Sequence, residues 1–167
     1  MDALSEPQYG TRGEVPHPRV EYAKVAPGVL QAMRALESYV HACGLEPALV
    51  ELVKVRASQL NGCAYCIDMH TKDARFGGET EQRLFALPAW RATPFFSERE
   101  RAALEWTEAV TAIADGHVPD AVYEGARRHF SEKELVDLTL AVVAINGWNR
   151  LAVSFRSVPG TYQPKRH

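Results

Sequence analysis

The chain is poor in cysteine and has no apolar stretch at its N-terminus. Three cysteines among 167 residues are too few for a disulfide framework, and two of them, Cys63 and Cys66, lie only three residues apart. This usage favours a thiol or metal site in a reducing compartment. The polar N-terminus also lacks the apolar segment of a secretory signal. We therefore expect a cytoplasmic protein.

The chain also has a small net charge and no long apolar run. A formal net charge of −2 at pH 7 gives no basis for binding nucleic acid or an anionic membrane surface. The longest apolar run, near residues 138–145, is far too short to cross a bilayer. Apolar residues make up 46% of the chain, which at this length is enough for one globular domain with its own core.

Proline and glycine are concentrated at the N-terminus, where large apolar residues are few. We interpret residues 1–22 as an extended arm, with a disordered tail as the alternative. The remaining residues, 23–167, show no repeat and no compositional break, so we expect them to form a single domain.

No segment alternates apolar and polar residues as a β-strand does, so the sequence predicts an all-α fold. Ser97 with Glu100 and Ser131 with Glu134 have the spacing of helix capping boxes. Apolar periodicity together with proline, glycine and these caps predicts helices at about 26–44, 47–62, 63–76, 80–87, 97–116, 119–130 and 131–151. The last is apolar nearly all round, which predicts burial in the core or in a subunit interface.

One segment gathers residues that carry chemistry. On a helix, Cys63, Cys66 and His70 fall within about 60° of one another and form one stripe. His70 lies one turn from Cys66, so its imidazole is within reach of the sulfur.

A carboxylate is expected beside the imidazole. Asn61 and Gly62 are typical of a turn between two antiparallel helices. Glu51 precedes that turn and His70 follows it by similar numbers of residues, so both lie roughly 14 Å from the bend. The hairpin therefore brings Glu51 level with His70.

These residue types suit a two-thiol redox cycle. A thiolate is the attacking species, and the first turn of a helix or a neighbouring imidazole favours it. Glu51 would orient His70, which would act as base. A sulfenic acid on one cysteine can condense with the other to a disulfide. The helix-end argument favours Cys63 as the attacking thiol and the base argument favours Cys66; we expect Cys66 to attack and Cys63 to resolve.

The pattern Glu–x₁₁–Cys–x₂–Cys–x₃–His resembles the core motif of the alkylhydroperoxidase AhpD-like family, within the carboxymuconolactone decarboxylase superfamily. The resemblance rests on residues 56–75 and on the Ala-Ile-Asn-Gly-Trp-Asn-Arg run at 144–150, and it extends over about 22–156. Tyr65 is a departure, since relatives often carry His there, and a phenol that titrates near 10 is a poor proton relay.

The resemblance implies an AhpD-like helical domain at 23–167 with a central antiparallel hairpin that carries the Cys-x-x-Cys pair. It implies thiol-dependent reduction of organic hydroperoxides or hydrogen peroxide in antioxidant defence, with Cys66, Cys63, His70 and Glu51 as the catalytic set. No bound cofactor is needed. The implied partners are a hydroperoxide, a thiol reductant such as a lipoyl-bearing protein or another dithiol, and further copies of the chain in a dimer, trimer or hexamer.

Other interpretations stay open at this point. Cys63, Cys66, His70 and Glu51 could bind zinc, although no second ligand pair is present. A lyase of the decarboxylase type would act without the cysteine pair, and a thiol switch or binding oligomer would need no turnover. Away from the motif, we expect Cys43 to be a small buried residue.

Two polar groups are interpreted as structural. Asp68 and Lys72 are expected to form an exposed pair on the helix face opposite the cysteines. Asn146, Asn149 and Arg150 lie beside an apolar helix, and we expect them to form hydrogen bonds at an interface rather than to take part in chemistry.

Overall fold

The computed structural model describes residues 17–164, which form eight α-helices, two short 3₁₀ helices and no strand. The all-α prediction is confirmed. Most of the arm expected at 1–22 falls on residues 1–16, which lie outside the described residues. The elements in chain order are α1 (Tyr22–Val25), α2 (Pro27–Ala42), α3 (Pro47–Leu60), α4 (Ala64–Phe76), α5 (Glu81–Ala86), η1 (Leu87–Ala92), α6 (Glu98–Thr111), η2 (Ile113–Asp115), α7 (Asp120–Arg127) and α8 (Glu132–Ser154).

Local signals in the sequence account for most helix ends. Both capping boxes are present, with Ser97 beginning α6 and Ser131 beginning α8. Pro47 stands in the first turn of α3, where its missing N–H costs no helical hydrogen bond. Gly62, with φ of 62°, adopts the left-handed conformation that lets the chain reverse between α3 and α4.

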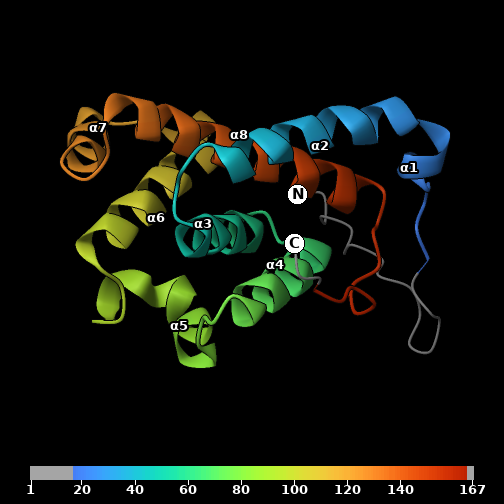
Figure 1. The fold of residues 1–167 in the computed structure, drawn as a ribbon, viewed down its shortest axis with the longest axis horizontal. Helices are drawn as coiled ribbons and strands as arrows, with labels where there is room; N and C mark the ends of the chain where they lie inside the picture. The colour runs from blue at the N-terminus through green and yellow to red at the C-terminus, as the bar shows by residue number, and fades with distance from the viewer. Residues whose placement is uncertain (1–16, 165–167) are drawn as a thin grey trace, which may run out of the picture.

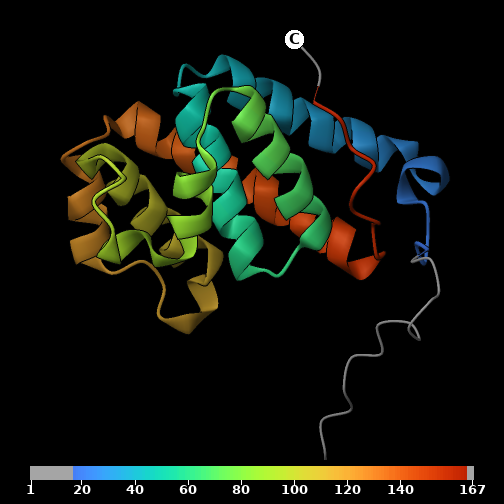
Figure 2. The same cartoon turned by 90° about the horizontal axis from the view of Figure 1, so that it is seen from below.

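The α3 helix is the centre of the molecule (Figures 1 and 2). It packs against α4, α6 and α8, while α2 lies along α8. Leu52, Val53 and Val55 of α3 have no exposed surface. The α3–α4 pair is the antiparallel hairpin expected from the sequence, and because α3 is enclosed, any side chain on its α4 face is held by the core.

The α8 helix is not buried on every side within one chain. Leu138, Ala141 and Ile145 are fully buried. On the other side, Val136 is 68% exposed and Val143 is 49% exposed. The core therefore covers only part of the apolar surface of this helix.

A segment after α8, residues 155–164, returns across α4. The side chain of Lys72 donates to the carbonyls of Gly160 and Tyr162, and Asp68 accepts the N–H of Gly160. The expected Asp68–Lys72 ion pair is confirmed, with 2.9 Å between Lys72 Nζ and Asp68 Oδ1, but the pair is half-buried rather than exposed because it anchors this C-terminal segment. Within residues 17–164 no helix combines the length and apolar character needed to cross a membrane.

Candidate active site

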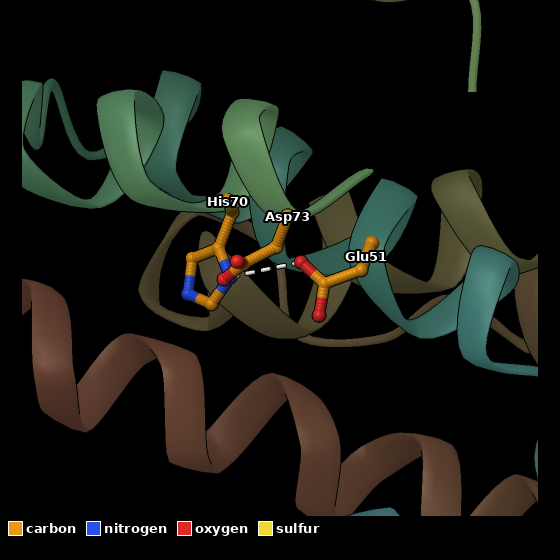
Figure 3. Close-up of side chains that lie close together, drawn as sticks. All are labelled: Glu51, His70 and Asp73. Carbon is orange, nitrogen blue, oxygen red and sulfur yellow. Dashed lines mark hydrogen bonds and ion pairs between the residues drawn. The ribbon is translucent and has the colours of Figure 1, made fainter. Parts of the chain in front are cut away.

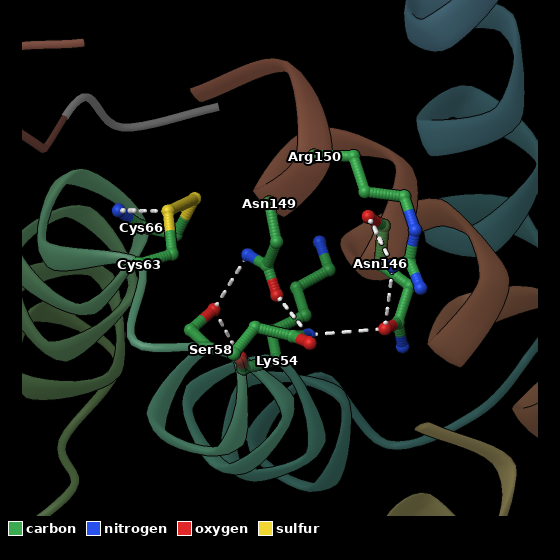
Figure 4. Close-up of a disulfide and its surroundings, with 8 residues drawn as sticks. Lys54, Ser58, Cys63, Cys66, Asn146, Asn149 and Arg150 are labelled. Carbon is green, nitrogen blue, oxygen red and sulfur yellow. Dashed lines mark hydrogen bonds between the residues drawn. A yellow bond between two sulfur atoms is a disulfide. The ribbon is translucent and has the colours of Figure 1, made fainter. Parts of the chain in front are cut away.

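Cys63 and Cys66 form a disulfide at the start of α4 (Figure 4). Their Cα atoms are 5.4 Å apart, which lies within the usual span of a disulfide. Cys63 is the N-cap residue, and its Sγ accepts the N–H of Cys66 at 3.3 Å. Both side chains are almost fully buried, with 1% and 2% of their surface exposed. The sulfur of Cys63 therefore occupies the position where a helix terminus favours negative charge.

Glu51 and His70 meet between α3 and α4, as their spacing predicted (Figure 3). His70 Nδ1–H donates to Glu51 Oε2 at 2.9 Å. His70 is 4% exposed, and its Nε2 is buried with no hydrogen-bond partner among the described residues. The hydrogen bond to the carboxylate fixes the orientation of the imidazole ring, and the lone pair of Nε2 is free to accept a proton.

The charge of Glu51 is stabilised by its neighbours. Burial by itself would raise the pKa of this carboxyl group. The hydrogen bond from His70 and the positive charges of His70 and Lys54 outweigh burial, so the pKa of Glu51 is lowered. Glu51 is therefore an anion at neutral pH.

A buried lysine lies on the other side of Glu51. Lys54 is 2% exposed; its Nζ is 2.7 Å from Glu37 Oε2 and 3.8 Å from Glu51 Oε1. The other oxygen of Glu37 accepts the indole N–H of Trp148 at 3.0 Å. A connected series of polar contacts thus runs from Trp148 on α8 to His70 on α4. Sequence reasoning missed Glu37 and Lys54 as neighbours of the site, for which the one signal was a lysine within the apolar stretch 49–55, and it treated Trp148 as a core or interface residue that could also line the mouth of the thiol groove.

A pocket of about 570 Å³ opens between α2, α3 and α4 on the Glu51–His70 side. Its walls include Met69, Asp73 and Phe76 of α4 as well as both relay residues. Tyr162 of the C-terminal segment closes one edge and donates its hydroxyl to Asp73 Oδ1 at 2.7 Å. Burial and the hydrogen bond to Asp73 raise the pKa of Tyr162, so its hydroxyl stays protonated. The pocket reaches the relay, but neither cysteine lines it.

The asparagines of α8 tie that helix to the end of α3 beside the disulfide (Figure 4). Asn149, 1% exposed, donates to Ser58 Oγ and accepts from Asn61 Nδ2. Asn61 also donates to Asn146 Oδ1. Arg150 in turn donates to Asn146 Oδ1. The hydrogen-bonding role expected for Asn146, Asn149 and Arg150 is thus present between helices of one chain, and their place at a subunit interface stays a prediction. Cys43 is only partly buried and directs its thiol to the carbonyl of Val40.

One group of side chains could present ligand atoms to a cation. Glu51, His70 and Asp73 bring a nitrogen and two carboxylate oxygens within 4.8 Å of one another (Figure 3). Within the described chain neither Cys63 nor Cys66 belongs to such a group. The zinc set considered from the sequence, which needs both sulfurs with Glu51 and His70, is therefore not assembled here.

Comparisons with known proteins agree with the fold. The profile of the carboxymuconolactone decarboxylase family matches residues 27–109. The uncharacterized protein YdfG of Bacillus subtilis is 46% identical over 136 residues, which cover 81% of this chain and 92% of YdfG. A crystal structure of a protein of unknown function from Agrobacterium tumefaciens, named as a candidate AhpD antioxidant defence protein, is 46% identical with a TM-score of 0.83 and covers 90% of this chain and 100% of that one. A peroxidase-related protein from Ralstonia eutropha, named as an alkylhydroperoxidase AhpD core, shares the fold at 22% identity and a TM-score of 0.74, over 86% of this chain and 77% of its own.

Proposed function

Because the chain belongs to the carboxymuconolactone decarboxylase family and has the AhpD-like fold, we propose that it is a thiol-dependent peroxidase. One observation carries the proposal. A buried pair of cysteines that can form a disulfide begins the helix on which, one turn after Cys66, His70 is held by Glu51 and has a free Nε2. This is the combination that a dithiol needs for repeated oxidation and reduction.

The first step is oxidation of Cys66. His70 Nε2 takes the proton of the Cys66 thiol, and Glu51 stabilises the resulting imidazolium. The thiolate attacks the terminal oxygen of a hydroperoxide, ROOH, and the O–O bond breaks. The leaving alkoxide takes the proton from His70 and departs as ROH, while Cys66 becomes a sulfenic acid.

The second step forms the disulfide and returns the enzyme to its starting state. The Cys63 thiol attacks the sulfur of the Cys66 sulfenic acid, so that an S–S bond forms and the S–O bond breaks. The hydroxyl group takes the proton of the Cys63 thiol and leaves as water. A dithiol reductant then attacks the disulfide, restores both thiols and is itself oxidised to a disulfide. Cys63 is suited to leave as a thiolate, because its Sγ accepts the N–H of Cys66 at the N-terminus of α4.

The reductant class we propose is a lipoyl-bearing protein or another small dithiol, and the compartment is the cytoplasm. We also propose that copies of the chain associate. The exposed valines of α8, Val136 and Val143, offer an apolar surface that a second copy would cover. Sedimentation velocity of the full chain measures whether it does.

The proposal is tested by reacting the reduced protein with a slight excess of cumene hydroperoxide and counting thiols. We expect rapid loss of two thiols, a Cys63–Cys66 bridge in the peptide masses, and reversal by dithiothreitol. Cys63→Ser should accumulate a sulfenic acid on Cys66 that dimedone traps. Cys66→Ser should abolish turnover, and Cys43→Ser is the matched control that keeps it.

Other outcomes identify the other interpretations. A sulfenic acid trapped on Cys63 in Cys66→Ser would reverse the order of the two thiols. Decarboxylase-type activity that is unchanged in Cys66→Ser would indicate a lyase. A single oxidation of the thiols, with no turnover whichever dithiol is supplied, would indicate a redox switch. Thiols that do not react with the peroxide would overturn the peroxidase assignment.

A further inference from the structure

We propose that the pocket between α2, α3 and α4 receives the body of a neutral organic hydroperoxide, and that Trp148 is the gate between this pocket and the two thiols. The inference rests on the proposed function, since it names the substrate class and the specificity-determining residue of the same site. It starts from a mismatch in the structure. The relay lines an open pocket, whereas the cysteines it serves are 1% and 2% exposed and line no part of it.

Two residues connect the pocket with the cysteines. His70 lines the pocket and stands one helical turn from Cys66. Trp148 lines the pocket and also packs against the cluster that contains Cys63 and Cys66. His70 is fixed by Glu51, so Trp148 is the side chain whose displacement would open a path to the sulfurs.

Trp148 lies where α8 packs against α2. A Cβ placed on the preceding residue, Gly147, would lie 2.9 Å from the Met33 methyl carbon, so α8 sits closely on α2 at this point. The indole ring is only partly buried, and its N–H donates to Glu37 Oε1. The ring gives up this hydrogen bond when it moves and can form it again when it returns.

The size and lining of the pocket indicate which class of hydroperoxide it would bind. Its volume of about 570 Å³ lies in the range of small-molecule sites and far exceeds what hydrogen peroxide fills. Apolar surface comes from Pro47, Ala48, Met69, Phe76 and Trp148.

The charged side chains of the pocket favour a neutral hydroperoxide over an anionic one. Two histidines, His41 and His70, line the pocket. The other charged groups are four carboxylates, on Glu37, Glu51, Asp73 and Glu79, and two permanent cations, on Arg34 and Lys54. An anionic hydroperoxide, such as that of a fatty acid, would be repelled by this excess. A neutral aryl or alkyl hydroperoxide would not.

The gate is tested by thiol labelling, which needs no turnover. In a Cys43→Ser background, the reduced protein is treated with iodoacetamide, which is small, or with N-phenylmaleimide, which is bulky and neutral, and labelling of Cys66 is followed by peptide mass. Trp148→Ala should raise labelling by N-phenylmaleimide about tenfold or more, with a much smaller change for iodoacetamide. Ala48→Phe, which fills the pocket from its exposed wall, should slow N-phenylmaleimide selectively. Ala121→Phe, an equally exposed alanine on α7 outside the pocket, should change neither rate.

The labelling rates decide whether Trp148 is the gate. Equal effects on both reagents, or unchanged labelling in both Trp148→Ala and Ala48→Phe, would overturn the gate. Should Trp148→Ala fail to fold, as judged by circular dichroism, Trp148→Phe and Ala48→Phe still test it. The substrate class is tested by oxidation of the wild type, which should be faster with cumene hydroperoxide than with linoleic acid hydroperoxide; the reverse preference would overturn it. If labelling responds as expected but no peroxide oxidises the thiols, the gate stands and the peroxidase assignment fails.

Discussion

At the scale of single residues, the unusual feature is a fully buried lysine between two carboxylates. Lys54 lies 2.7 Å from Glu37 and 3.8 Å from Glu51, with 2% of its surface exposed. An ion pair of this kind adds little net stability over an apolar pair, because both charges lose water. Its positive charge lies between two carboxylates that would otherwise repel each other, one of which, Glu51, accepts the hydrogen bond of His70.

This arrangement predicts a strong coupling between Lys54 and Glu37. Lys54→Met should lower the free energy of unfolding by about 3 kcal/mol, because it removes the ammonium group 2.7 Å from the largely buried Glu37 carboxylate. Adding Glu37→Gln should recover part of that loss, since the unpaired charge is removed while an oxygen remains for the Trp148 N–H. Urea unfolding of the two single variants and the double variant gives the coupling energy. A double variant whose loss equals the sum of the single losses would show that the pair is not coupled.

At the scale of elements, helix ends connect sequence with structure most directly. Ser131 accepts the N–H of Glu134 through its hydroxyl, and its own N–H donates to Glu134 Oε2 at 2.8 Å. Hydrogen bonds to the Glu134 carboxylate, first from the backbone N–H and the side chain of Ser131 and then from Arg99, lower its pKa to about 2. The box secures the start of α8, the helix that carries Trp148 and the asparagines beside the disulfide.

The cap has a defined pH dependence. A carboxyl group whose pKa is lower in the folded chain stabilises the fold above its unfolded pKa, and the stabilisation is lost as pH falls toward the folded value. The contribution of Glu134 should thus be complete above about pH 4.5 and decline toward pH 2. Glu134→Gln should therefore be less stable than the wild type at pH 6, with the difference shrinking by pH 3, as measured by urea unfolding. Ser131→Ala should cost about 1 kcal/mol at pH 6. A wild-type advantage over Glu134→Gln that is equal at both pH values would contradict this role.

The limits of sequence reasoning also lie at this scale. Helix starts and the level placement of Glu51 and His70 follow from local rules, namely the capping boxes, Pro47 and the rise per residue. The C-terminal segment could not be predicted, because Lys72 binds carbonyls about ninety positions away in the chain. Likewise the partners of Lys54 depend on where α2 lies, and no local pattern specifies that contact.

At the scale of the whole molecule, the disulfide lies inside a core that does not need it. The bridge joins residues three apart, whereas α3 is enclosed by apolar side chains of α4, α6 and α8. A thiol pair that is oxidised and reduced in every cycle requires a fold that persists in both states. The hydrogen bonds from Asn149 to Ser58 and from Asn61 to Asn149 fix the hairpin beside the sulfurs independently of the bridge.

Reduction should therefore leave the fold intact and lower its stability only modestly. Closing so short a loop restricts the unfolded chain by about 2 kcal/mol at most on the chain-entropy account, which corresponds to a few degrees in Tm for a chain of this size. Far-UV circular dichroism with and without dithiothreitol should be superimposable, and thermal unfolding should show the small decrease in Tm. Cys63→Ser cannot form the bridge, so its Tm should not respond to dithiothreitol and should lie near that of the reduced wild type. A loss of helical signal on reduction would instead mean that the disulfide holds α4 in place, and such a protein would suit a single-use redox switch better than a peroxidase that turns over.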